Sequence, residues 1–399
     1  MIPDFAGELE LLLSESIATI DRRQRKHFNR AAAPYTQIAL YGAGNLGRKL
    51  IRQIRQNGRD ICCLTDNNQS LWGSEVEGTE VLSPSVAAGR FGSSAAFVVS
   101  IWNYAHSFAN TRSYLRLLGC QRILPVHALM CGPGEGLLPH YSLDWPSTLL
   151  AAAADVRKGL EVWADDQSKA HYVSTVRARL EMNPALLPLP LDHYPPDVLA
   201  PSADEVFVDC GAYDGDTIVD FIRRRSGRFQ QIVGIEPDPG NFDRLKAAVA
   251  GLAPDLRPRV KLVNAAAAEA RCTAQFVATG TMASALATQS PAMAETTVAV
   301  ECAPLDELLD SVAPTLVKVD IEGAELSLLK GARSLISRAK TAWAVTTEHR
   351  LEDLWALPLY FRSLSGEYDL FLRPHGYEAW DLVCYAVPRG RAPILQAQS

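Results

Sequence analysis

The sequence lacks several features that would place it in a specialised class of protein. None of its eight cysteines forms a C-x-x-C pair, so we expect reduced, buried thiols. No apolar run is long enough to cross a membrane and no basic segment opens the chain, which predicts a cytoplasmic protein without a membrane partner. No block of five or six like charges occurs, and 39 basic against 45 acidic residues leave a net charge of −6, which argues against nucleic acid as a partner.

The composition indicates a folded protein with more than one domain. The 399 residues are 48% hydrophobic and 21% charged, which is enough apolar material to fill folded cores. Six prolines between 184 and 201 favour an extended linker there. We expect a helical segment over 1–34, an α/β domain over 35–130, a helical connector and proline-rich linker over 131–202, and a second α/β domain over 203–399.

Short apolar runs alternate with helix-like stretches in both halves of the chain. In the first half the runs are 38–41, 61–64, 95–100 and 122–126. In the second half they are 206–209, 232–236, 260–264, 273–278, 298–302, 315–320, 342–348, 368–373 and 381–387. This alternation predicts two doubly wound α/β domains. The last two runs have no helix between them, so the second sheet is expected to end in an antiparallel hairpin.

A turn rich in acids and glycines follows the first strand of the second half. Asp209 ends this strand, Gly211 and Gly215 let the backbone approach a ligand closely, and the acids of the turn would repel a pyrophosphate. Glu236 at the next strand end can accept the hydroxyls of a ribose, and Asn264 at the third strand end adjoins an adenine-sized space. The set predicts S-adenosylmethionine as cofactor; the alternative is that the acids only cap helices and form turns. The candidate cofactor-binding residues are Asp209, Gly211, Tyr213, Gly215, Thr217, Glu236, Pro237, Asn264 and Ala265.

Five segments of the second half resemble a known family. They are VDCGAYDGDT, GIEPDPGNFDRL, VKVDIEGAELSLLKGA, TTEHRLEDLWALPL and YDLFLRPHGYEAWDLVCYAVP. Over residues 205–388 the chain resembles the FkbM-type S-adenosylmethionine-dependent methyltransferases. The resemblance implies a class I methyltransferase-like sheet and an O-methyltransferase that acts on a hydroxyl of a small molecule, such as a sugar, a nucleotide sugar or a secondary metabolite. A homo-oligomer is compatible with this interpretation.

The candidate catalytic residues lie at two further strand ends. Asp320 ends the run at 315–320, Glu322 follows it, and His349 lies just beyond the next run. Methyl transfer from a sulfonium needs alignment and a group that takes the acceptor's proton, so we expect His349 to be that group and Asp320 to orient the hydroxyl or the imidazole. The three side chains could in principle hold a divalent ion, but Lys318 on the same strand face would repel it, so we expect no metal.

The first half has its own glycine turn after a strand. Gly42, Gly44 and Gly47 match G-x-G-x-x-G before a helix, with Asn45 among them and Asp66 at the next strand end. Such a turn can seat a pyrophosphate and the acid a ribose, so 35–130 is a candidate Rossmann-like domain for a nucleotide or nucleotide sugar. The glycines could equally serve only helix–strand packing. A nucleotide-dependent oxidoreductase that uses this turn, and a non-catalytic ligand-binding protein, therefore stay open as alternatives to the methyltransferase.

Overall fold

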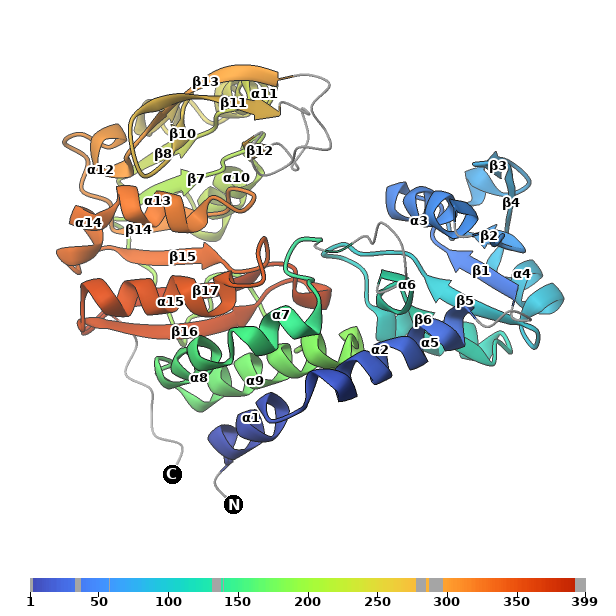
Figure 1. Ribbon diagram of the computed structural model, residues 1–399. Helices are drawn as coiled ribbons and strands as arrows, with labels where there is room; N and C mark the ends of the chain where they lie inside the picture. The colour runs from blue at the N-terminus through green and yellow to red at the C-terminus, as the bar shows by residue number, and fades with distance from the viewer. Residues whose placement is uncertain are drawn as a thin grey trace. The chain divides into compact units, whose positions relative to one another are not determined.

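A computed structural model (Figure 1) describes residues 3–391 except 33–36, 57, 131–137, 139, 278–284 and 287–296. The chain divides into two compact units. Unit 1 comprises Met1–Arg157, Lys169–Pro190 and Pro374–Asp381, and unit 2 comprises Lys158–Ser168, Leu191–Arg373 and Leu382–Ser399. No helix in the described ranges is long and apolar enough to span a membrane.

Unit 1 is built around a six-stranded sheet in the order β3-β4-β2-β1-β5-β6. β1 pairs in parallel with β2 on one side and β5 on the other, so the strand order reverses beside β1. Apolar clusters around Leu50 and around Phe97 cover the two faces. The strands are β1 (Gln37–Tyr41), β2 (Cys63–Thr65), β3 (Glu75–Val76), β4 (Thr79–Leu82), β5 (Ala95–Val99) and β6 (Arg122–Pro125).

The helices up to Leu186 lie in unit 1, except that α8 and α9 also include residues of unit 2. They are α1 (Phe5–Leu13), α2 (Ile17–Ala32), α3 (Asn45–Gln56), η1 (Gln69–Leu71), α4 (Pro84–Phe91), α5 (Phe108–Leu117), α6 (His127–Met130), α7 (Pro146–Ala151), α8 (Ala153–Glu161), α9 (Asp166–Glu181) and η2 (Pro184–Leu186). The short turn η5 (Tyr377–Ala379) also belongs to this unit.

Unit 2 contains a seven-stranded sheet in the order β16-β17-β15-β14-β7-β8-β9. β7 pairs in parallel with β8 and β14, so the strand order reverses between β7 and β14. β7 and β15 are buried along their whole length, as expected for parallel strands covered on both faces. The strands are β7 (Val206–Cys210), β8 (Gln231–Ile235), β9 (Val260–Val263), β14 (Leu316–Val319), β15 (Ala342–Thr346), β16 (Tyr368–Pro374) and β17 (Leu382–Pro388).

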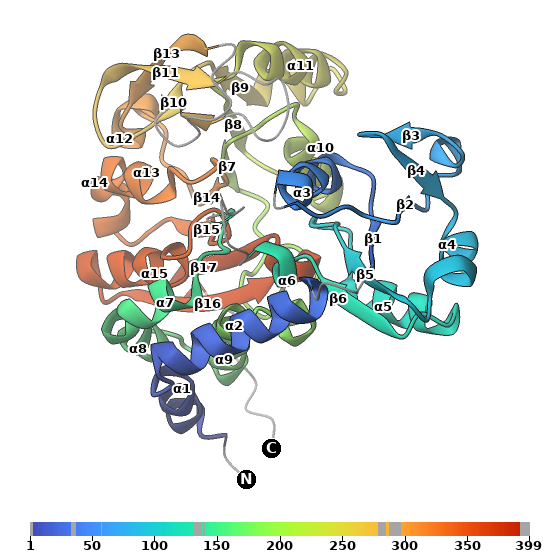
Figure 2. The ribbon, with the colours of Figure 1, turned by 45° about the vertical axis from the view of Figure 1, so that its right-hand side comes forward.

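Helices cover both faces of the seven-stranded sheet (Figures 1 and 2). On one face Phe207 of β7 stacks on Phe221 of α10, with ring centroids 4.3 Å apart. On the other face the Trp343 ring of β15 lies 5.9 Å from that of Phe361 in α15. The helices are α10 (Asp216–Arg224), α11 (Pro239–Ala250), η3 (Arg257–Arg259), α12 (Leu305–Leu308), α13 (Glu325–Gly331), α14 (Arg333–Ser337) and α15 (Asp353–Leu364). The predicted doubly wound α/β architecture is confirmed, and β17 runs antiparallel to β15 beside its hairpin partner β16.

Two predicted strands of the second sheet form a separate sheet instead. β11 (Cys272–Val277) pairs antiparallel with β13 (Thr297–Ala303), and together with β10 (Ala266–Ala267) and β12 (Ala285–Leu286) they make a four-stranded sheet. The prediction that 273–278 and 298–302 join the larger sheet is therefore wrong. The physical reason is that exposed and buried residues alternate along β13, which exposes every second residue of its first half and buries Val300 and Cys302. Strands of the parallel sheet are instead apolar on both faces.

The proline-rich segment is packed in its second half, unlike the extended linker that we expected. Val198 and Leu199 are 0% and 1% exposed within the core of unit 2, and the Tyr194 ring lies against Phe207 and Phe221. The exposed part is shorter, around Leu189, which is 74% exposed. The ranges 1–34, 35–130, 131–202 and 203–399 stay a prediction as folding domains, and residues 131–137 and 139 lie outside the described residues.

Each unit includes a segment that the chain order would assign to the other. Within unit 2, Ala164 donates its backbone N–H to Leu370 O at 2.8 Å, and the buried Arg373 pairs with Asp165 at 2.5 Å. Within unit 1, the Glu378 carboxylate of the β16–β17 connection lies 3.1 Å from His106 Nδ1. The units are therefore linked by more than one crossing of the chain.

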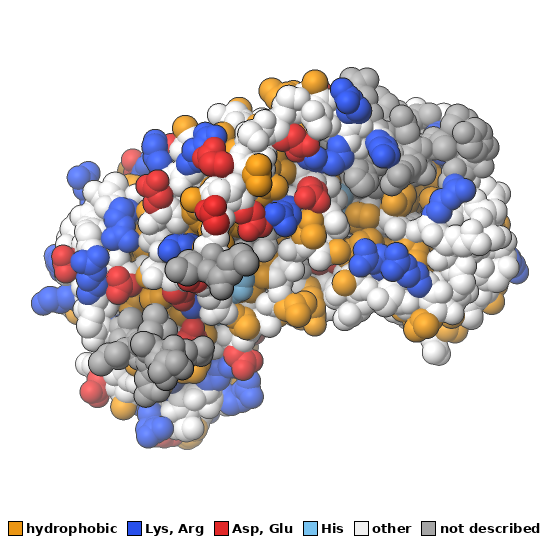
Figure 3. All heavy atoms as spheres, turned by 90° about the horizontal axis from the view of Figure 1, so that it is seen from below, with side chains coloured by type: hydrophobic (Ala, Val, Ile, Leu, Met, Phe, Trp, Pro, Cys, Tyr) orange, Lys and Arg blue, Asp and Glu red, His pale blue; other side chains and the backbone are white. Residues whose placement is uncertain are grey.

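The surface carries both signs of charge. On the face in Figure 3, acidic and basic side chains are interspersed at the left and centre of the view. On the helices of unit 1, Arg157 pairs with Glu10 and Arg177 with Glu8, each at 2.6 Å. This pattern agrees with a protein whose function does not depend on a large field of one sign.

Candidate active site

The glycine turn after β7 is shaped by the neighbouring strand. Gly211 has φ +85°, and a Cβ placed there would lie 1.9 Å from the backbone oxygen of Asp320, which follows β14. Gly215 has φ +90° and begins α10 as its N-cap. Both positions require glycine, because an L side chain is strained at this φ and the close approach leaves no room for it. The turn thus brings the ends of β7 and β14 together.

Glu236 closes the same turn from the end of β8. Its Oε2 accepts from Tyr213 N and its Oε1 from Asp238 N, both at 2.9 Å. Burial raises the pKa of Glu236 to about 7, although these hydrogen bonds oppose the shift. The carboxylate therefore holds the turn in place with protein donors, and keeps part of its acceptor capacity because each oxygen has two lone pairs.

The end of β9 is tied to the end of β8. Asn264 Nδ2 donates to Glu236 O at 2.8 Å and to Pro237 O at 3.2 Å, and Ala265 beside it is buried. Thr217 lies in the first turn of α10. The structure thus brings the predicted cofactor-binding residues to one edge of the sheet.

Asp209 lies beneath this edge. It is fully buried, Lys318 Nζ lies 3.5 Å from its Oδ1, and neither oxygen makes a hydrogen bond of standard geometry within the described residues. Burial raises the pKa of Asp209 to about 6, although the charge of Lys318 acts in the opposite direction. Lys318 Nζ also lies 3.2 Å from Asp320 Oδ2, so this ammonium bridges two carboxylates from neighbouring strand ends.

The three candidate catalytic side chains lie together, with Asp320 and Glu322 beside the imidazole of His349. Its Nε2 lies 3.6 Å from Asp320 Oδ1 and 3.8 Å from Glu322 Oε1, while its Nδ1 lies 2.7 Å from Glu325 Oε1. Although burial opposes it, the Glu325 carboxylate raises the pKa of His349 well above its ordinary value. This shift favours the protonated ring, an imidazolium that donates from Nδ1 to Glu325 and has no lone pair left to accept a proton.

Glu322 is the member of this cluster whose ionisation lies near neutrality. Burial raises its pKa to about 7, opposed by the charge of His349. The charges of Lys318 and His349 hold the pKa of Asp320 below its ordinary value against the effect of burial. No group of three or more His, Cys, Asp or Glu side chains in the described ranges is arranged to hold a metal ion, and we assign no metal ligand here.

Comparison with known proteins gives the segment that contains these residues a family. The family model described as "Methyltransferase FkbM domain" matches residues 209–379. We call residues 209–379 the FkbM domain after this match. The resemblance predicted from the sequence is confirmed for this segment, which spans both the glycine turn and the catalytic cluster.

Among the solved structures that match this chain, a methyltransferase is similar to it over nearly its whole length. The crystal structure of a methyltransferase FkbM from Methylobacillus flagellatus KT matches with a TM-score of 0.72 and 22% sequence identity, over 96% of this chain and 98% of that chain. At this identity the similarity shows a shared fold. No curated protein matches this chain.

Sequence reasoning missed two residues around the FkbM domain's cluster. Glu325 was visible only as part of a family motif, and no spacing rule says that its carboxylate reaches His349. His193, in the proline-rich segment, precedes the Tyr194 ring that packs on Phe207 of β7. Burial lowers the pKa of His193, and the charge of Lys318 adds to this effect. Because the sequence predicts a linker here, nothing in it indicates that this histidine lies close enough to Lys318 to be affected by its charge.

The glycine turn of unit 1 has the same hydrogen-bonding pattern as the turn in the FkbM domain. Asp66 at the end of β2 accepts from Ala43 N of the turn at 2.8 Å and from Asn68 N at 2.8 Å, as Glu236 accepts from Tyr213 N. Asp66 therefore closes its own turn.

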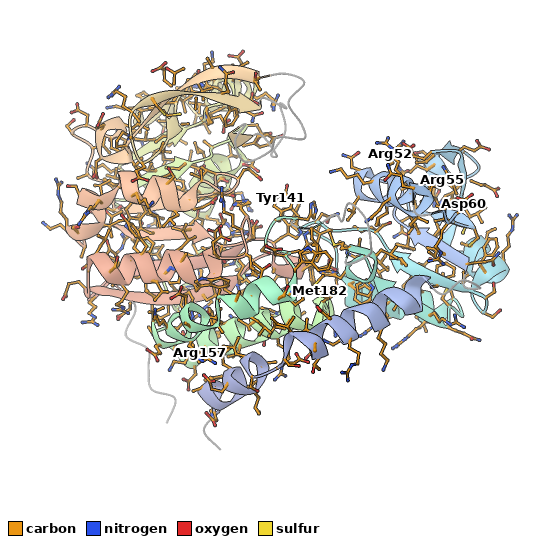
Figure 4. The ribbon with its side chains drawn as sticks, viewed as in Figure 1. Arg52, Arg55, Asp60, Tyr141, Arg157 and Met182 are labelled. Atoms are coloured by element: carbon orange, nitrogen blue, oxygen red, sulfur yellow. The ribbon has the colours of Figure 1, made fainter. Side chains whose placement is uncertain are left out.

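The glycines of this turn differ in what surrounds them. A Cβ on Gly42 would lie 2.6 Å from Ile101 Cγ1, and one on Gly47 would lie 2.2 Å from Gly42 O, so both glycines serve close packing. Gly44 and Asn45 are exposed. Two arginines of the following helix, α3, are in ion pairs: Arg55 with Asp60 at 3.0 Å, and Arg52 with Glu77 at 2.6 Å (Figure 4). Binding of a nucleotide or nucleotide sugar at this turn stays a prediction.

Proposed function

We propose that this protein is an S-adenosylmethionine-dependent O-methyltransferase that acts on a hydroxyl of a small molecule, such as a sugar, a nucleotide sugar or a secondary metabolite. The observation that carries the proposal is the joined edge of the FkbM domain. There the acid-rich glycine turn, the ribose-type acid Glu236 and the cluster around His349 lie at the ends of adjacent strands.

The residues of this edge fit a cofactor that is a cation at its reactive end. The glycine turn bears Asp214 and Asp216 and no basic residue from 211 to 217, so it disfavours a pyrophosphate and favours a sulfonium and an ammonium. Gly211, Tyr213, Gly215 and Thr217 would hold the amino-acid end.

At the other end of the cofactor, Glu236 would accept from the ribose, and Pro237, Asn264 and Ala265 would adjoin the adenine. Asp209 is fully buried, so its part would be indirect, through Lys318.

The cofactor, when bound, supplies a methyl group on a positively charged sulfur. Transfer of this group to the acceptor oxygen would leave S-adenosylhomocysteine, and the hydroxyl proton would have to pass to the protein. Glu322 suits this role because its pKa of about 7 lets it be charged and still accept a proton near neutral pH. Asp320, held as a carboxylate by Lys318 and His349, would orient the hydroxyl, and the His349 imidazolium would stabilise both carboxylates.

The first experiment measures cofactor binding by calorimetry with S-adenosylhomocysteine. Glu236→Ala should weaken binding by about 2–4 kcal/mol, because charge-assisted hydrogen bonds in a buried site are lost and the turn loses its closing acceptor. Asp243→Asn on the exposed face of α11 is the matched control and should bind like the wild type. Unchanged affinity in Glu236→Ala would contradict the assignment.

The second experiment looks for turnover. Wild-type protein with S-adenosylmethionine and a panel of nucleotide sugars and polyols should give a methylated product and S-adenosylhomocysteine by mass spectrometry, and Glu322→Gln should lower turnover by about 10²–10⁴-fold with cofactor binding preserved. Binding of NADH or NADPH with hydride transfer and no methyl transfer would favour the oxidoreductase alternative.

A further inference from the structure

One carboxylate beside the cluster has no direct part in methyl transfer, yet it contacts both the loop after β14 and the His349 ring. Glu325 is the first residue of α13 and is fully buried. Its Oε1 accepts from Ile321 N at 3.0 Å and from Gly323 N at 3.3 Å, and lies 2.7 Å from His349 Nδ1. The loop 320–324 is thereby folded around a single oxygen atom.

The backbone of this loop explains why it needs such support. Glu322 has φ +55° and Gly323 has φ +94°, so two successive residues are in the left-handed region. A non-glycine residue in this conformation persists only where surrounding contacts hold it. The N–H donors on either side of Glu322 are both bound to Glu325, which places the Glu322 side chain at the edge of the site.

The contact with Glu325 also decides how the imidazole is turned. With Nδ1 donating to Glu325, the other ring nitrogen is directed at Asp320 and Glu322, at 3.6 and 3.8 Å. A ring rotated by half a turn would place carbon atoms against Glu325 and leave its buried carboxylate with fewer donors, which is costly. The ring orientation is thus fixed from behind, by a residue that the acceptor does not touch.

We propose that Glu325 is the positioning residue of this site: its carboxylate holds the loop 320–324 and the His349 ring in one arrangement, so that Nε2 of the ring faces the carboxylates of Asp320 and Glu322. The loop and ring geometry does not depend on the reaction; only the effect on turnover rests on the proposed methyl transfer.

Several charges surround the ring and must be considered together. Carboxylates face it from four elements: Glu325 from α13, Asp320 and Glu322 from the loop after β14, Glu348 from the end of β15 and Asp353 from α15. Arg350 is the nearest cation in sequence, and its Nε is engaged with Gly323 O at 2.7 Å. Glu325 is the nearest of the carboxylates and acts first in raising the pKa of His349. Loss of its charge should therefore have the largest effect on the ring.

The decisive variant is Glu325→Gln in the full-length protein. An amide oxygen at Oε1 can accept the same hydrogen bonds, and the amide nitrogen replaces Oε2, which accepts none within the described residues, so the fold should be retained. NMR titration of the His349 ring, assigned with His349→Asn, should show its pKa lowered by about one pH unit or more. Glu348→Gln is the matched control: that buried carboxylate accepts from Leu382 N at 3.0 Å, and its effect on the pKa of His349 comes after those of Glu325 and Glu322, so the variant should lower the pKa less.

Turnover gives the functional readout once an acceptor is known. In Glu325→Gln we expect kcat to fall by about 10²-fold with little change in the affinity for S-adenosylhomocysteine, and the pH–rate profile to gain an ionisation near the ordinary pKa of histidine. A purely structural role would lower activity without moving the pH profile.

Each outcome tests either the positioning role of Glu325 or the proposed methyltransferase function. An unchanged His349 pKa in Glu325→Gln, or equal shifts in Glu325→Gln and Glu348→Gln, would overturn the positioning role. If the variant does not fold, the wild-type spectrum still tests it: a strongly downfield Nδ1–H proton of His349 is expected, and its absence refutes the contact. The expected ring titration in a protein that binds no S-adenosylhomocysteine would refute the proposed function and leave the positioning role standing.

Discussion

Replacing Lys318 by methionine tests the electrostatic arrangement beneath the site. The ammonium lies 3.2 Å from Asp320 and 3.5 Å from the fully buried Asp209, so its removal leaves two carboxylates facing each other. Breaking a buried pair costs about 3–5 kcal/mol, and because the Lys318 side chain is 18% exposed we expect the lower end, about 3 kcal/mol, at about pH 8.

The loss should depend on pH with a definite sign. Burial raises the pKa of Asp209 to about 6, so at about pH 5 this carboxyl is protonated in the folded protein and repels Asp320 little. The destabilisation by Lys318→Met should then fall to about 1–2 kcal/mol. In the double variant Asp209→Asn with Lys318→Met, about 1–2 kcal/mol of the loss at about pH 8 should be recovered, because residues in contact are not additive.

The assay is urea denaturation followed by tryptophan fluorescence at both pH values. Lys330→Met is the control: its pair with Glu269 is exposed at 3.4 Å and should contribute less than about 1 kcal/mol. A loss below about 1 kcal/mol at about pH 8, or an equal loss at both pH values, would refute the reasoning.

Three further expectations follow from the same structure. Gly211→Ala should destabilise the protein by about 2–4 kcal/mol in thermal unfolding and weaken S-adenosylhomocysteine binding, because its Cβ would lie 1.9 Å from Asp320 O. An unchanged melting temperature would contradict this expectation, since it would show that β14 can move away at no cost. Burial raises the pKa values of Glu236 and Glu322 to about 7, so both side chains gain negative charge as the pH rises. Calorimetry should therefore show tighter binding of the cationic S-adenosylmethionine at about pH 8 than at about pH 6, with a smaller change for S-adenosylhomocysteine. Equal changes for the two ligands would contradict this expectation. Limited proteolysis should cut first at 189–193, and the two fragments should co-elute in gel filtration because each unit contains segments from both sides of the cut; fragments that separate would show that these segments contribute little.

Local patterns in the sequence were sufficient to locate the parts of the site. The apolar runs ending at Asp209, at Glu236 and at Asp320 predict parallel strands, and parallel strands place their carboxyl ends at one edge whatever packs around them. The glycines at 211 and 215 predict a tight turn because few other residues adopt positive φ. Periodicity failed at 273–278 and 298–302, since a short apolar run does not reveal which sheet will pair with it.

The charge state of the site could not be read from the chain. Histidine has an ordinary pKa suited to proton acceptance, but in the folded chain the carboxylates around His349, first Glu325 at 2.7 Å, raise the pKa of the ring and favour the imidazolium. Ionisation depends on distances between residues far apart in sequence and on the loss of water around them, neither of which a spacing encodes.

The sequence by itself thus determined the two α/β sheets, the glycine turns and the strand-end acids, because these depend on φ, ψ and hydrophobic periodicity. The tertiary structure alone decided that Lys318 bridges two carboxylates, that Glu325 holds the ring and the loop, and that both units exchange segments of the chain. These are contacts between distant residues, formed only when the sheet and the helices on its faces bring them together.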